Sequence, residues 1–175
     1  MSKTITSGAA VAVMLLGAAA MAQPSAPPTD PQIAHIAYTA DQIDIAAAKQ
    51  ALAKSKNAKV REFATEMVRD HTTVNTQALA LVHKLKVTPQ PNATSSALSK
   101  AAADKRAQYA KLTGAAFDRA YAANEVAYHH SVNGALSDTL IPNAHNAELK
   151  SLLGTALTLF QEHEQHAEHL VADLK

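Results

Sequence analysis

REFATEMVRDHTTVNTQALALVHKL, residues 61–85, carries the clearest helical pattern in the chain. Its apolar residues recur at steps of three and four, the period of a helix that buries one stripe of its surface. Met67, His71 and Val74 lie on that stripe, so the pattern places a histidine among core residues. Two later helical segments carry His129 and His163 on or beside their own apolar stripes. We therefore expect a helical bundle with imidazoles that face its interior.

The composition is typical of an all-helical protein. The 175 residues are rich in alanine and include five glycines and no tryptophan, and no long stretch alternates apolar with polar residues. A chain of this length is expected to form one domain with a sizeable core. The formal net charge is +1 and no basic tract stands out, so nucleic acid is not expected as a partner. The chain has no cysteine, which excludes a disulfide framework.

The first residues have the pattern of an export signal. Lys3 precedes an apolar run at residues 8–19, and Ala20-Met21-Ala22 forms an A-x-A cleavage site. The run is shorter than the roughly 20 residues that span a bilayer. Residues 1–22 are therefore predicted to be a signal peptide and the mature protein to be periplasmic, without stable membrane insertion. The alternative is a retained signal anchor.

Beyond the signal, the pattern predicts one helical domain at residues 30–175, preceded by a Pro-rich spacer at residues 23–29. Asp30 is expected to cap a first helix that ends near residue 55, and Asn57 to cap a second helix over residues 58–86. Residues 87–96 are expected to form a loop. A short helix over residues 96–111 follows, then a third main helix over residues 115–140, which stops before Pro142, and a fourth over residues 146–174.

This order of helices predicts an all-α fold, a ferritin-like four-helix bundle with an extra short helix in the second-to-third connection. A short helix of this length can carry the chain back along the bundle, so the second and third main helices are expected to be parallel. A plain up-down-up-down bundle is the alternative.

Five polar residues are predicted at similar heights in the interior. They are Asp44 on the first helix, His71 on the second, Glu125 and His129 on the third and His163 on the fourth. Glu125 and His129 are four residues apart and share a helix face. A set of imidazoles and carboxylates suits Fe, Zn, Mn or Cu better than Ca or Mg. The five residues are therefore candidate ligands of a transition metal, with a purely structural polar network as the alternative.

Other polar residues fit this set less well. Asp70 and Glu162 each precede a histidine and point about 100° away from it, as outer partners or surface groups would. His35 is nine residues before Asp44, on the opposite side of its helix. His166 and His169 extend His163 into a tract that is typical both of metal binding and of a solvated helix end.

The sequence does not predict an enzyme. Ferritin-like di-iron sites use two Glu-x-x-His motifs, whereas Glu125 and His129, like Glu162 and His166, are four residues apart. No catalytic residue and no organic cofactor are predicted.

Four segments, taken in order, resemble a known family. They are DQIDIAAAKQAL, SKNAKVREFATEMVRDHTTVN, GAAFDRAYAANEVAYHH and FQEHEQHAE, and they are similar to domain of unknown function 4142 over about residues 30–174. The resemblance implies an exported bacterial protein, often labelled a predicted outer membrane protein, with a ferritin-like bundle and no settled activity. It places the family's Asp-His pair at Asp70-His71 and its later histidines at His129 and His163. Asp44 stands where the family usually carries Glu.

Two functional hypotheses follow. The first is a periplasmic bundle that binds or handles a transition metal. The second is a non-catalytic envelope or stress-associated bundle that binds a protein partner, forms a homo-oligomer or has a purely structural role. An exposed apolar stripe on the helix at residues 96–111 would favour the second.

Overall fold

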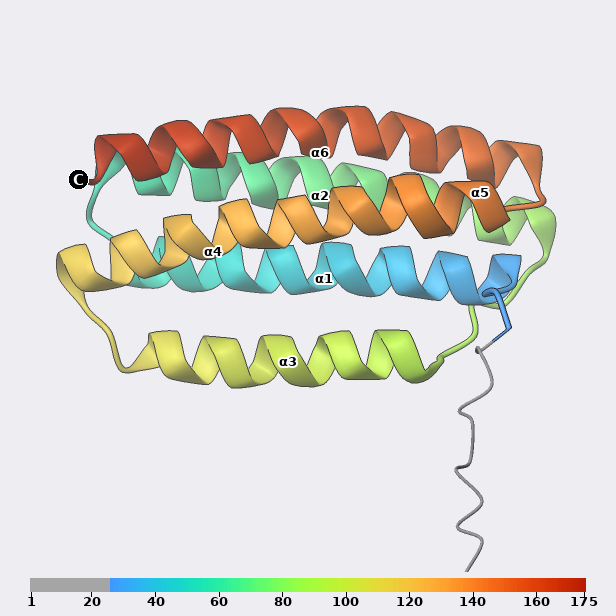
Figure 1. The fold of residues 1–175 in the computed structure, drawn as a ribbon, viewed down its shortest axis with the longest axis horizontal. Coiled ribbons are helices and arrows are strands. Elements are labelled where there is room, and N and C mark those ends of the chain that lie inside the picture. The colour runs from blue at the N-terminus through green and yellow to red at the C-terminus, as the bar shows by residue number, and fades with distance from the viewer. Residues whose placement is uncertain (1–25) are drawn as a thin grey trace, which may run out of the picture.

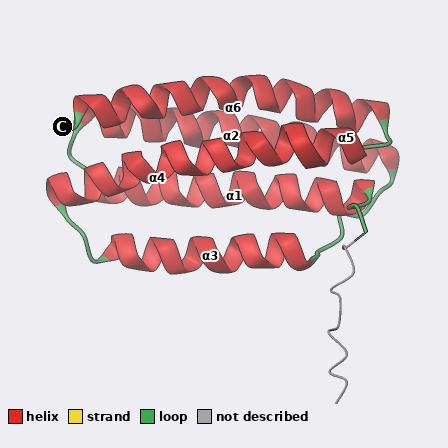
Figure 2. Cartoon of the chain, viewed as in Figure 1, coloured by secondary structure: helices red, strands yellow, loops and turns green. Residues whose placement is uncertain are grey.

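The computed structural model describes residues 26–175, which fold into a bundle of helices (Figure 1). The long helices are α1 (Asp30–Lys54), α2 (Ala58–Leu85), α3 (Ala93–Ala110), α4 (Gly114–Ala135) and α6 (Ala147–Asp173). Figure 2 shows helices and loops and no strand in this part of the chain, which confirms the all-α prediction. The predicted signal peptide, residues 1–22, lies outside the described residues.

No helix within residues 26–175 is both long enough and apolar enough to cross a membrane.

One of the two predicted caps is present. The side chain of Asn57 accepts hydrogen bonds from the backbone N–H groups of Lys59 and Val60 at the start of α2. Asn146 caps α6 in the same way. The other prediction, Asp30 as the cap of α1, is wrong by one residue, because the N-cap of α1 is Thr29. Asp30 instead accepts hydrogen bonds, both of 2.8 Å, from the backbone N–H groups of His145 and Asn146. This carboxylate therefore ties the start of α6 to the start of α1.

Helix α3 begins three residues earlier than predicted, so the loop expected at residues 87–96 is shorter. Asn92 is its N-cap and accepts a hydrogen bond of 3.0 Å from the backbone N–H of Ser95. The Ser95 hydroxyl in turn lies 3.1 Å from the backbone N–H of Asn92 and accepts its hydrogen bond. This reciprocal pair stabilises the first turn.

The predicted stop before Pro142 is also wrong. After α4 the chain continues through a π-helical turn, η1 (Leu136–Leu140), into the short α5 (Ile141–Asn143). Proline lacks an N–H, and its ring would clash with the carbonyl four residues earlier in an α-helix. The wider π turn relieves this crowding, and the N–H of Ile141 bonds the carbonyl of Leu136, five residues back.

The four main helices pack as two antiparallel pairs. Helix α1 packs on α2 and α4 packs on α6, while α2 also contacts α6 and α1 contacts α4. Helix α3 runs along the outer side of α1 and returns the chain to the other end of the bundle (Figure 1). As a result α2 and α4 run in the same direction, as the length of their connection predicted.

The interior has two apolar clusters with a polar layer between them. One cluster includes Val60, Met67 and Tyr121, and the other includes Ile33 and Leu153. In α2, His71 lies between Met67 of the first cluster and Val74 at the edge of the second. The same succession recurs in α1, α4 and α6, where Asp44, Glu125 with His129, and His163 interrupt the apolar stripe. The polar layer is therefore built into every main helix at the same height.

Candidate metal centre

The polar layer contains all five residues that the sequence placed at compatible heights. Asp44 comes from α1, His71 from α2, Glu125 and His129 from α4 and His163 from α6. Each of the five is between 1% and 2% exposed. Flanking apolar residues hold each helix in register, so the five side chains meet in two adjacent groups that share His129: His71, His129 and His163, and Asp44, Glu125 and His129.

The three imidazoles form a nearly equilateral triangle. Their ring centroids are 5.3 Å apart for His71 and His163, 5.5 Å for His129 and His163, and 5.7 Å for His71 and His129. One donor nitrogen from each ring lies within 4.8 Å of the donor nitrogens of the other two. The rings therefore surround a common point.

The carboxylate of Asp44 adds a fourth donor. Its Oδ2 lies 3.3 Å from Nε2 of His71 and 3.4 Å from Nε2 of His129. Four donors placed tetrahedrally around an ion at about 2.0–2.1 Å lie about 3.3–3.4 Å from one another. The two distances therefore match two edges of a tetrahedral site. Glu125 contributes a further oxygen, which lies within 4.8 Å of donor atoms of Asp44 and His129.

Each of the three histidines uses its other ring nitrogen for a contact outside the centre. The three contacts join His71 Nδ1 to Asp41 Oδ1 at 2.7 Å, His129 Nδ1 to the backbone oxygen of Glu125 at 3.0 Å, and His163 Nε2 to Asp70 Oδ2 at 3.2 Å. In metalloproteins such contacts fix the orientation of a ligating imidazole and leave its second nitrogen free for the ion. All three histidines show this arrangement.

The atoms that face the centre lack hydrogen-bond partners within residues 26–175. They are Nε2 of His71, Nε2 of His129, Nδ1 of His163 and both carboxylate oxygens of Asp44 and Glu125. Asp44 Oδ2 and His71 Nε2 lie 3.3 Å apart, which is an ion-pair distance when His71 is protonated. Leaving so many buried polar atoms unpaired is costly. A cation coordinated by some of these atoms would reduce this cost.

The three histidines differ in the direction in which their surroundings shift the pKa of the ring. Burial lowers the pKa of His129, and it lowers the pKa of His163 to about 4, so both rings are neutral near pH 7. Burial would also lower the pKa of His71, but Asp44 and Asp41 outweigh it and raise this pKa to about 10. Without a metal, His71 therefore carries a proton between two carboxylates. An ion at the centre would take the place of that positive charge.

The metal-free protein is expected to lose stability as the pH rises from 7 to 9.5. In the folded state His71 holds its proton up to a pKa of about 10, whereas the ordinary value is 6.5. Its contribution is therefore complete below pH 6.5 and is lost as the pH rises through 10. At about 1.36 kcal/mol per pH unit, the free energy of unfolding falls by about 3 kcal/mol between about pH 7 and pH 9.5. Urea unfolding in the presence of EDTA measures it.

The matched variants in that experiment are His71→Gln and His83→Gln. The first removes the titrating group and should flatten the dependence of stability on pH, and the second changes an exposed histidine and should leave it as in the wild type. An equally steep dependence in His71→Gln would show that another group carries the proton.

The other histidines lie away from the centre. His35 contacts Thr39 on its own helix, at 3.4 Å. His166 Nδ1 lies 2.7 Å from Glu66 near the surface. His169 and Glu162 are exposed. The tract at the end of α6 therefore contributes one residue, His163, to the centre.

Two neighbours of His71 were not predicted as parts of the site. Asp41 bonds this imidazole and is three residues before Asp44, on the same face of α1, a spacing that the sequence does show. Phe160 stacks on the His71 ring with a centroid distance of 4.5 Å and an interplanar angle of 23°. No spacing within one helix reveals this contact, because it joins α2 to α6.

The family comparison agrees with the resemblance seen in the sequence. No curated protein and no solved structure matches the chain. A family model described as "Domain of unknown function (DUF4142)" matches residues 16–170. Because this match covers most of the sequence, the chain belongs to the DUF4142 family.

Proposed function

We propose that this protein is a metal-binding bundle of ferritin-like type that holds one transition-metal ion in its polar layer. The observation that carries the proposal is the set of buried atoms without hydrogen-bond partners: one nitrogen from each of three imidazoles that group together, and the carboxylate of Asp44, which groups with His129 and Glu125. The two antiparallel helix pairs joined through α3 support the ferritin-like arrangement.

The donor set favours a borderline metal. Three imidazoles and a carboxylate suit Zn, Fe, Cu or Mn, and the distances of 3.3 Å and 3.4 Å from Asp44 Oδ2 to two of the imidazoles, which fit two edges of a tetrahedron, favour Zn. An ion bound by all three imidazoles and by Asp44 would have its four tetrahedral positions filled, with none open to a substrate. We therefore propose that the centre stores, buffers or simply holds its metal and does not catalyse a reaction.

Export belongs to the same proposal. The pattern at residues 1–22, with Lys3, an apolar run and an A-x-A site, supports cleavage after Ala22 and a periplasmic protein. A periplasmic location would expose the protein to metal ions that enter the envelope.

The test is elemental analysis of protein purified from the periplasm without a histidine tag. We expect an intact mass that begins at Gln23 and about one metal ion per chain, because the two buried donor groups share His129. Co²⁺ added to the metal-free protein should produce the intense visible bands of a tetrahedral ion. Protein that is isolated without metal and that takes up neither Zn²⁺ nor Co²⁺ would refute the metal-binding proposal.

A structural network is the second candidate. The 2.7 Å contact of His71 with Asp41 and its proximity to Asp44 favour it, because a protonated His71 neutralises one of these carboxylates without any ion. The related proposal of a protein partner has less support. Leu79 is the large apolar residue that residues 26–175 leave exposed, and it lies on α2. The apolar stripe on α3 that would favour a partner is therefore not seen in the described chain.

A further inference from the structure

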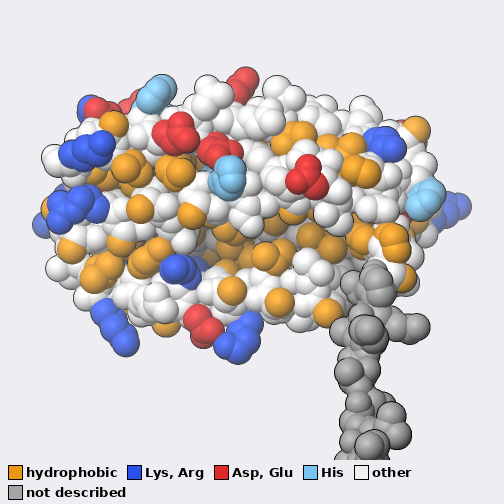
Figure 3. Space-filling view, viewed as in Figure 1, with side chains coloured by type: hydrophobic (Ala, Val, Ile, Leu, Met, Phe, Trp, Pro, Cys, Tyr) orange, Lys and Arg blue, Asp and Glu red, His pale blue; other side chains and the backbone are white. Residues whose placement is uncertain are grey.

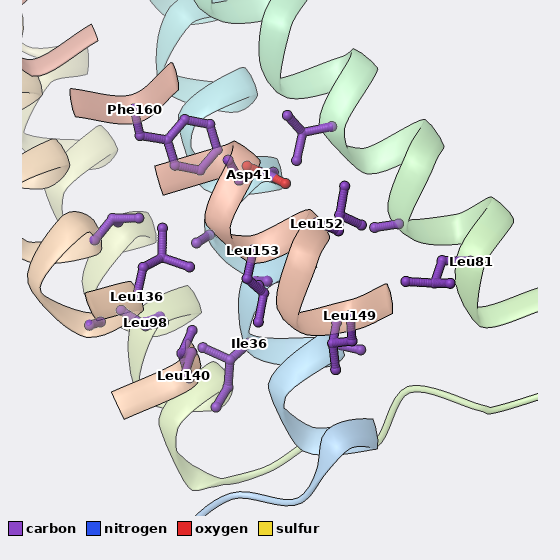
Figure 4. Close-up of a pocket in the computed structure, with 18 of the residues that line it drawn as sticks. Ile36, Asp41, Leu81, Leu98, Leu136, Leu140, Leu149, Leu152, Leu153 and Phe160 are labelled. Carbon is purple, nitrogen blue, oxygen red and sulfur yellow. The ribbon is translucent and has the colours of Figure 1, made fainter. Parts of the chain in front are cut away.

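An apolar cavity of about 140 Å³ lies beside the polar layer. Its walls come from α1, α2, α3, α4, η1 and α6. Figure 4 shows Ile36, Leu136, Leu140, Leu149 and Leu153 around it. The cavity thus occupies the apolar cluster on the η1 side of the centre.

The π turn helps to form this cavity. Leu136 and Leu140, the first and last residues of η1, both line it and are buried. Protein interiors are normally filled to the density of organic crystals, so a void of this size is unusual. Turns with π geometry often mark functional sites within helices.

Two polar side chains of the cavity wall, those of Asp41 and Tyr128, already have partners, and the third polar residue, Ser131, is exposed. Asp41 is the charged residue of the lining, and its Oδ1 is 2.7 Å from Nδ1 of His71. The hydroxyl of Tyr128 donates a hydrogen bond of 2.8 Å to the backbone oxygen of Ala40. A water molecule needs two to four polar partners, and this lining offers few free ones. The cavity is therefore suited to an occupant without charge.

We propose that the cavity binds a small neutral apolar molecule of about six to eight non-hydrogen atoms, such as a monocyclic aromatic hydrocarbon. An engineered apolar cavity of about 150 Å³ in another protein stays dry and binds benzene or xenon. The occupant would touch Asp41 and Phe160, the two residues that bond and stack on His71. Binding in the cavity would therefore change the surroundings of His71 in the polar layer.

We place the approach to the cavity beside α3. Leu98 of α3 and Val132 of α4 both belong to its lining. Figure 3 shows hydrophobic side chains gathered in a recess between α3 and α4 on the face that is viewed. A small molecule could enter there without separation of the four main helices.

The probe for this proposal is toluene, added to the full-length mature protein. At about ten times its Kd, toluene is expected to raise Tm by about 3–5 °C. Benzoate has a similar size but carries a charge that the apolar wall and Asp41 disfavour, so it should produce no rise. No rise with toluene, or an equal rise with benzoate, would overturn the proposal.

Two variants fill the cavity, and one matched variant does not. Ala156→Leu and Ala78→Leu each add a side chain to the lining, from α6 and α2, and both should abolish the toluene effect. Ala80→Leu makes the same change two residues along α2 at an exposed position and should keep it. If Ala156→Leu fails to fold, Ala78→Leu still tests whether filling the cavity abolishes the toluene effect. A toluene effect that survives in a folded filling variant would place the binding site elsewhere.

Proton NMR of the imidazoles tests the link to the centre. Toluene should shift the His71 resonances and leave those of the exposed His83 unchanged. Binding without a change at His71 would overturn the proposed position of the ligand. The cavity proposal does not depend on the metal, because a protein that binds toluene but no metal would keep this inference and lose the proposed function.

Discussion

Zn²⁺ in excess is expected to raise the Tm of the metal-free protein by about 5–10 °C, and His71→Ala or His129→Ala is expected to remove most of this rise. A ligand at about 100 times its Kd stabilises the native state by about 2.7 kcal/mol. In a domain of this size, each kcal/mol corresponds to about 2–4 °C. Both imidazoles present an unpartnered Nε2 to the centre, so the loss of either removes a donor. Differential scanning calorimetry with and without Zn²⁺ measures the effect.

His169→Ala is the control for this experiment. His169 is exposed on α6, so its loss should leave the Zn²⁺-induced rise unchanged. Asp44→Asn is the milder variant of the centre, because it keeps the shape of the side chain and removes its charge. It should also weaken the rise. A rise that persists in His71→Ala and His129→Ala but disappears in His169→Ala would place the metal on the surface tract of α6.

The spacing of apolar residues was enough to predict most of the fold. Long amphipathic segments can bury only one face, and their lengths, with the short link at Asn57, predict antiparallel neighbours. The errors lie at helix ends, where local hydrogen bonds decide. Thr29 replaces Asp30 as a cap because Asp30 bonds the start of α6, more than one hundred residues away in the chain. The π turn before Pro142 depends on packing that no spacing within α4 reveals.

The polar layer was predicted for a similar reason. Residues at the same height in helices of similar length must meet inside a bundle, and this places His71, His129 and His163 together. Height does not show which ring nitrogen faces inward, because that depends on outer partners such as Asp41. The cavity was not predicted at all. A void is a property of all its walls together, and each wall residue taken alone is an ordinary core residue.

Phe160→Ala is expected to lower the free energy of unfolding by about 3–5 kcal/mol, the usual cost of removing a buried phenyl ring. The ring is buried, stacks on His71 and forms part of the cavity wall. Its removal would join a new void to a cavity of about 140 Å³, and neighbouring side chains could not close both.

Leu79→Ala is the control for Phe160→Ala, because Leu79 is 49% exposed and should change stability by no more than about 0.5 kcal/mol. Urea unfolding of the metal-free proteins measures both variants. Since Phe160 offers no donor atom, the Zn²⁺-induced rise in Tm should persist in Phe160→Ala even though the protein is weaker. The two measurements distinguish a packing role of Phe160 from a role in metal binding. A decrease in the free energy of unfolding of less than about 1 kcal/mol would contradict the packing of α6 against His71. Loss of the Zn²⁺-induced rise in Tm would show that the stacked ring is needed to orient the imidazole.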